Sequence, residues 1–204
     1  SDDNIRVYSR QTGLSDSDVR LIRYNASTRT LVIAYANGNI DLMTSDGIYN
    51  LPFLKNTTNI QDKTLNAIDL SGDRAYLSAN FGILVIDLKK REVAETYRLD
   101  RRTTATALLG GSIYAATDSG LLAAATTDNL MDVANWKRVS LNSLDFDDQK
   151  IVGLGAFRDR LCFVASGGGL FYRDTDGSIK TLRKQTNLRG LTVVGNRLVA
   201  YTAE

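Results

Sequence analysis

The 204-residue chain carries 25 basic and 23 acidic side chains, a net charge of +2, so no global field selects nucleic acid or an anionic membrane as a partner. Histidine is absent, which removes the commonest zinc ligand and the commonest general base. No stretch approaches the roughly 18 apolar residues of a membrane helix. The single cysteine, Cys162, excludes an intramolecular disulfide and is expected to be buried in the apolar run RLCFVA.

The first predicted element is a strand at residues 5–9, IRVYS, with the pattern of an outer strand whose earlier partners are missing. Four units follow, each with an apolar run, a turn containing glycine and a second apolar run. This order is typical of a β-hairpin. The hairpins are LVIAYANGNIDLM from Leu31, AYLSANFGILVIDL from Ala75, SIYAATDSGLLAAA from Ser112 and RLCFVASGGGLFYRD from Arg160.

The turn glycines of these hairpins give the period of the repeat. Gly38, Gly82, Gly120 and Gly169 follow one another at steps of 44, 38 and 49 residues. A β-rich stretch flanks each hairpin on both sides, so each unit holds four strands. Four strands in about forty residues is the spacing of a β-propeller blade. The sequence therefore predicts an all-β chain, a β-propeller segment of about four complete four-stranded antiparallel blades.

We expect residues 1–204 to form a single propeller domain or fragment with partial blades at both ends. The last segment supplies two inner strands and stops where the next glycine turn should come. The strand at 5–9 could join them and close a small ring, or an open arc could expose sheet edges. The predicted blades are 13–54, 63–100, 103–141, 150–183 and a partial blade at 188–204.

The loops of one face are the expected binding surface. In this strand order, the hairpin turns and the connections between units emerge on the same side, where propellers usually bind ligands. Positive φ in tight turns also explains the Asn and Gly residues there without any ligand. The candidate residues on this face are Asn37, Asn39, Asn80, Phe81, Asp118, Ser119 and Arg101.

No catalytic, metal or cofactor site is expected. Asp41 and Asp87 recur in matching IDL strings, so we expect equivalent environments in different blades, whereas catalytic pairs need different ones. The acidic string at residues 145–148 lacks the spaced ligands and the glycine of a calcium loop. The basic string at 89–91 could hold an anionic polymer or serve solubility at a strand edge.

The string GLSD at residues 13–16, followed by YANGNIDL and SANFGILVIDL, carries a family resemblance. Over roughly residues 5–140 the chain resembles the PorZ-like N-terminal β-propeller family, from a type IX secretion system component of Bacteroidetes. The GLS string also resembles, more distantly, the propellers of two-component regulators.

The resemblance implies a non-enzymatic binding or scaffold propeller at the periplasm or outer-membrane surface. It implies assistance to the sortase that attaches cargo to an anionic lipopolysaccharide, with the sortase or another secretion component as protein partner, and no cofactor. No motif for either contact can be matched in this sequence. The alternative is the extracytoplasmic ligand-sensing propeller of a hybrid two-component regulator. A propeller enzyme is disfavoured, because no histidine and no unmatched carboxylate pair stand out.

Overall fold

The computed structural model describes residues 6–141 and 150–202. These residues contain four four-stranded antiparallel sheets, which we call blades one to four, and one two-stranded sheet. Blade one is β1 (Val19–Asn25), β2 (Thr30–Tyr35), β3 (Ile40–Thr44) and β4 (Gly47–Leu51), and blade two is β5 (Leu65–Ser71), β6 (Arg74–Ala79), β7 (Gly82–Asp87) and β8 (Glu92–Arg98). Blade three is β9 (Thr103–Leu109), β10 (Ser112–Thr117), β11 (Gly120–Ala125) and β12 (Lys137–Arg138). Blade four is β13 (Ile151–Phe157), β14 (Arg160–Ala165), β15 (Leu170–Arg173) and β16 (Ile179–Arg183), and the last sheet pairs β17 (Leu188–Val194) with β18 (Arg197–Thr202).

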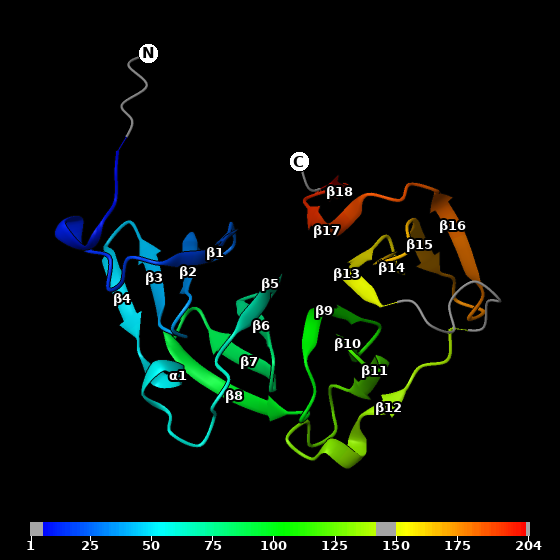
Figure 1. Cartoon of the computed structure of the whole chain (residues 1–204), viewed down its shortest axis with the longest axis horizontal. Coiled ribbons are helices and arrows are strands. Elements are labelled where there is room, and N and C mark those ends of the chain that lie inside the picture. Colours follow the sequence, from blue (N-terminus) through cyan, green and yellow to red (C-terminus); the bar gives the residue numbers. More distant parts are fainter. Residues whose placement is uncertain (1–5, 142–149, 203–204) are drawn as a thin grey trace.

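The blades stand side by side along an arc (Figure 1). Their first strands, β1, β5, β9, β13 and β17, lie toward the middle of the arc, and the fourth strands lie on its outer side. Neighbouring blades contact one another mainly through these inner strands. The chain is a β-propeller segment, which confirms the predicted fold class.

The hydrophobic core consists of layers between neighbouring blades. The central strand β7 shows why, since both of its faces are apolar and buried. Leu84 and Ile86 pack in the cluster shared with blade one, whereas Ile83 and Val85 pack in the cluster shared with blade three. A strand that is apolar on both faces must be covered on both sides, so the blades stabilise one another by stacking.

Side-chain hydrogen bonds also join the inner strands. The second residue of β1, β5 and β9 donates in each case to the carbonyl oxygen of the first residue of the next inner strand. The three bonds are Arg20 Nε to Leu65 O at 2.8 Å, Asn66 Nδ2 to Thr103 O at 2.8 Å, and Thr104 Oγ1 to Ile151 O at 2.9 Å. Blade four has Val152 at this position, which offers no side-chain donor.

Residues 129–136, NLMDVANW, have the pattern of a helical turn in a long connection. The 3-10 helix η2 (Val133–Asn135) does lie in that connection, between β11 and β12. The structure adds the 3-10 helix η1 (Arg10–Thr12) and the single-turn helix α1 (Phe53–Asn56), which follows Pro52.

The strand predicted at residues 5–9 is not formed over residues 6–9, and Ile5 lies outside the described residues. A strand needs a partner for its backbone groups, and β17 and β18 pair only with each other among the described residues. In Figure 1 residues 6–9 instead run away from the sheets. Closure of a small ring was one of the two outcomes left open, and residues 6–9 do not form the pairing with β17 and β18 that it requires.

Candidate functional site

The candidate loops gather on one face of the arc, which we call the loop face. It is formed by the β2–β3, β6–β7 and β10–β11 turns and by the connections that follow β4 and β8. A Cβ on Gly38 would lie 3.1 Å from the Cβ of Lys63, which places the first turn against the connection after β4. The Arg101 guanidinium donates to Ser119 Oγ at 2.7 Å, which ties the third turn to the connection after β8.

Asp16 holds the loops of blade one together on the loop face through hydrogen bonds. Its Oδ2 accepts hydrogen bonds from Asn37 Nδ2 at 2.9 Å, Asn39 Nδ2 at 3.0 Å and Lys55 Nζ at 2.8 Å. The bonds from Asn37 and Lys55 lower the pKa of this carboxyl to about 2. Two candidate side chains are thus engaged in holding a turn, and Asn39 is buried as well.

Blade two repeats the arrangement with different residues. Asn80 Nδ2 donates to Asp62 Oδ2 at 2.7 Å, and Asn80 Oδ1 accepts from Asn66 Nδ2 at 2.9 Å. The bond from Asn80 lowers the pKa of Asp62. Phe81 is partly buried and packs against the core between blades one and two.

The charged candidates on the loop face are more accessible. Asp118 and Arg101 are exposed, and the partly buried Ser119 is held between Arg101 and Thr117. The loop face therefore presents a surface of hydrogen-bonded turns with exposed charges. Such a surface is suited to docking, because its polar groups need little ordering when a partner binds.

A buried polar network lies beneath this face. Asp41 is fully buried, and its carboxylate accepts from Tyr35 Oη at 2.6 Å, Ser15 N at 2.8 Å and Asn50 Nδ2 at 2.9 Å. Burial alone would raise the pKa of Asp41, but these hydrogen bonds outweigh it and the pKa is lowered. Asp87 is only partly buried and accepts a backbone N–H within its own turn. The expectation of equivalent environments for the two aspartates is therefore wrong.

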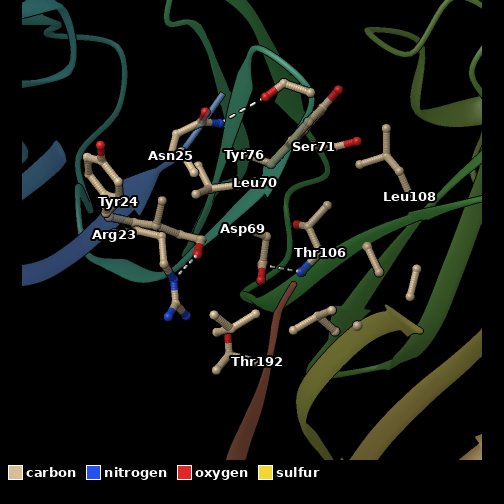
Figure 2. A pocket seen from close by; sticks show the side chains of 18 of the residues that line it. Arg23, Tyr24, Asn25, Asp69, Leu70, Ser71, Tyr76, Thr106, Leu108 and Thr192 are labelled. Carbon is tan, nitrogen blue, oxygen red and sulfur yellow. Dashed lines mark hydrogen bonds between the residues drawn. The ribbon is translucent and has the colours of Figure 1, made fainter. Parts of the chain in front are cut away.

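A cavity of about 520 Å³ lies at the other end of the inner strands. Residues from the second halves of β1, β5, β9, β13 and β17 line it, and Figure 2 shows Arg23, Asp69, Thr106 and Thr192 around it. None of these residues is among the candidates predicted from the sequence. One signal was available, because Asp69 stands in a third IDL string, at residues 68–70.

Asp69 and Arg23 are the charged residues among those that line the cavity. The carboxylate of Asp69 accepts the backbone N–H of Thr106 at 2.8 Å, and burial raises its pKa to about 7. Arg23 donates through Nε to Ile68 O at 3.2 Å. This bond joins blades one and two and fixes the guanidinium at the cavity wall.

A smaller cavity of about 240 Å³ lies between blades two and three. It shares Tyr76 with the first cavity and is also lined by Arg74, Glu95 and Tyr97. Arg74 Nη1 lies 3.6 Å from Glu95 Oε1, and Tyr97 Oη donates to the same carboxylate. These polar groups therefore bind one another across the cavity wall.

Other features bear on the remaining sequence predictions. Cys162 is buried, as expected, and burial raises its pKa. Lys89 and Lys90 pair with Asp73 and Glu92 at the blade edge, and the acidic string at 145–148 lies outside the described residues.

Within residues 6–141 and 150–202, no three His, Cys, Asp or Glu side chains are grouped to hold a metal ion. No helix in those two ranges has the length and apolar character to cross a membrane.

Comparison with known proteins supplies the family. A model described as the N-terminal β-propeller domain of PorZ, of the type IX secretion system, matches residues 1–137. The chain is also similar to the solved structure of PorZ, an essential bacterial surface component of the type IX secretion system of Porphyromonas gingivalis. The identity is 28% and the TM-score 0.82, over 96% of this chain and 28% of PorZ. The chain thus spans about 28% of the length of that protein.

Two further structures share the fold. The Cps50 (Swd1) β-propeller domain of Myceliophteria thermophila is 12% identical with a TM-score of 0.72, over 93% of this chain and 63% of that one. The extracellular domain of a putative one-component system of B. thetaiotaomicron is 14% identical with a TM-score of 0.59, over 87% and 24% of the two chains. At these identities the likeness shows the propeller fold alone. A search of curated proteins found no match.

Proposed function

The chain belongs to the family of PorZ N-terminal β-propeller domains of the type IX secretion system, and we propose that it serves there as a non-enzymatic docking domain. The observation that carries the proposal is the family match, together with a propeller that superposes on PorZ over nearly the whole chain. In this role the domain assists the sortase and the attachment of cargo to lipopolysaccharide. Its place is the periplasm or the outer-membrane surface.

We infer that the partner docks on the loop face. Two features of this face support the inference. The turns are held by side-chain hydrogen bonds such as those of Asp16 and Asn80, so the backbone is already ordered before a partner arrives. The charges of Arg101 and Asp118 are exposed on the same face, and exposed charges at an interface steer association and select partners.

The experiment is a pull-down from a Bacteroidetes outer-membrane extract, with the sortase and lipopolysaccharide quantified by mass spectrometry and glycan detection. Wild-type protein is compared with Arg101→Glu, on the loop face, and with Lys90→Glu, an equal charge reversal in the β7–β8 turn on the opposite face. We expect the sortase to be recovered with wild type and Lys90→Glu, and to be lost with Arg101→Glu. Equal recovery of the sortase with both variants would show that it does not dock on the loop face. No recovery of the sortase with wild type would refute the scaffold role.

The same experiment decides the alternative of a ligand-sensing propeller. A sensor domain binds a defined small ligand and needs no secretion partner. Capture of one oligosaccharide, with neither sortase nor lipopolysaccharide recovered, would therefore favour the sensor over the docking domain.

A further inference from the structure

Docking on the loop face does not involve the cavity among the inner strands, so the role of this cavity needs a separate explanation. It lies at the far end of the inner strands, and its volume of about 520 Å³ is within the range of small-molecule sites, roughly 300–1,000 Å³. Apolar side chains such as Leu154 and Val193 line part of the wall, and Arg23 and Asp69 supply its charge. A cavity that combines an apolar part of its wall with polar groups able to orient a ligand is typical of ligand sites.

Arg23 places an uncommitted cation at the cavity wall. Its Nε donates to Ile68 O at 3.2 Å, and the two Nη atoms lie beyond this bond at the end of the side chain, as Figure 2 shows. These Nη atoms form no hydrogen bond or ion pair with any other described residue. A guanidinium with two free donors in one plane matches the geometry of a carboxylate or a phosphate.

Thr192 provides a second donor on the facing strand. Thr192 lies on β17, the last inner strand along the chain, whereas Arg23 lies on β1, the first. Both residues line the same cavity. Its hydroxyl has no hydrogen-bond partner among the described residues. A cation from β1 and a hydroxyl from β17 can therefore converge on one bound group.

Asp69 does not neutralise Arg23 in the way a surface carboxylate would. Its carboxylate accepts the backbone N–H of Thr106, and the charge of Arg23 lowers its pKa without offsetting the effect of burial. Because burial raises its pKa to about 7, it is largely protonated in mildly acidic solution. The other titratable groups that face the cavity are the phenols of Tyr24 and Tyr76, and burial raises the pKa of Tyr76. The cavity is then net positive.

We propose that this cavity binds a small molecule through an oxyanion, a carboxylate or a phosphate, held by the Nη atoms of Arg23 and the hydroxyl of Thr192. The site is separate from the docking role, because it lies at the other end of the inner strands and takes a small ligand. The partner can fail to dock while the cavity still binds its ligand, and the cavity can fail to bind a ligand while the partner still docks.

The test uses isothermal titration calorimetry of the chain in an amine buffer at about pH 6, with glutarate, inorganic phosphate and uncharged glutaramide as probes. We expect glutarate or phosphate to bind and glutaramide not to bind. Binding of glutarate alone identifies a carboxylate ligand, and binding of phosphate alone identifies a phosphate ligand. Binding of neither anion, or equal binding of glutaramide, would overturn the proposal.

Arg23→Gln and Arg20→Gln form a matched pair of variants. Both arginines are on β1 and both donate through Nε to a carbonyl of β5, so both changes remove one interblade bond. Arg23 lines the cavity and Arg20 does not. We expect the anion affinity to fall about tenfold or more in Arg23→Gln, and to stay unchanged in Arg20→Gln. Equal losses of anion affinity in both variants would show that binding depends on net charge alone, and would overturn the proposed site.

A pH series checks the part played by Asp69. As the pH rises from about 6 to 8, ionisation of Asp69 places a negative charge beside the bound anion, so the affinity for glutarate should fall. Asp69→Asn keeps an acceptor for Thr106 N and should abolish this fall. A pH dependence that persists in Asp69→Asn would contradict the assigned arrangement.

Discussion

Asp41→Asn is expected to destabilise the propeller, because Asp41 binds three donors from separate segments of blade one. Tyr35 Oη and Ser15 N both donate to Oδ2, at 2.6 and 2.8 Å, and Asn50 Nδ2 donates to Oδ1 at 2.9 Å. An asparagine can place its carbonyl oxygen at the Oδ2 position and keep the first two bonds without the charge. Its amide then meets the amide of Asn50, donor against donor.

The magnitude follows from these losses. A hydrogen bond to a charged group contributes about 1.5–3 kcal/mol, and a neutral one about 1 kcal/mol. One charge-assisted bond is lost and two are weakened, so we expect a loss of about 2–4 kcal/mol in the free energy of unfolding. In a chain of this size that lowers Tm by on the order of 10 °C.

Thermal and urea unfolding of Asp41→Asn measure this loss, and Asp87→Asn is the matched control. Asp87 stands in the same IDL string one repeat later, but it accepts the backbone N–H of Lys90 at 2.9 Å, a bond that asparagine can keep. Its change in unfolding free energy should stay within about 0.5 kcal/mol. Because the bond that holds Ser15 N is weakened when its acceptor loses the charge, trypsin should also cleave faster at Arg10 in Asp41→Asn. Equal losses in the two variants, with unchanged cleavage, would refute the reasoning.

Two further predictions concern pH. The pKa of Asp16 is lowered to about 2, so its stabilising effect is complete above its ordinary pKa and is lost as the pH falls from about 4 to 2. Asp16→Ala should therefore cost about 1–2 kcal/mol at neutral pH and almost nothing at the acid end, as measured by Tm against pH; a constant cost would contradict this. The pKa of Asp69 is raised to about 7, so the wild type should lose stability as the pH rises from about 4 to 7. Asp69→Asn should remove this decline and be more stable at about pH 8 by on the order of 2 kcal/mol, and a decline of equal size in the variant would show that another group is responsible.

Much of the fold follows from local patterns in the sequence. Glycines at positive φ recur at Gly38, Gly82 and Gly120, and the apolar runs around them are long enough for strands. A turn and its two flanking strands are adjacent in sequence, so their pattern predicts the hairpin. The strand predicted at residues 5–9 is not formed over residues 6–9, because pairing depends on a partner that is distant in sequence.

The candidate site, like the fold, follows from the sequence only where local patterns are enough to predict it. Strand order alone predicts that the hairpin turns and the connections share a face, since each strand reverses direction. Which side chains on that face remain free is a separate matter, decided by partners such as Asp16, which engages Asn37 from 21 residues away. The cavity was missed for the same reason, because Arg23 and Thr192 line one cavity only when five inner strands are set side by side.

The sequence by itself determined the repeat, the strand order, the family and the burial of Cys162, since each depends on local periodicity or on strings that stand intact in the chain. Only the tertiary structure decided that Asp41 is buried while Asp87 is not, although both stand in the same string. It also decided that Asp69 faces a cavity. The physical reason is that a carboxyl group's solvation and hydrogen-bond donors come from segments far away in sequence, which identical local strings do not specify.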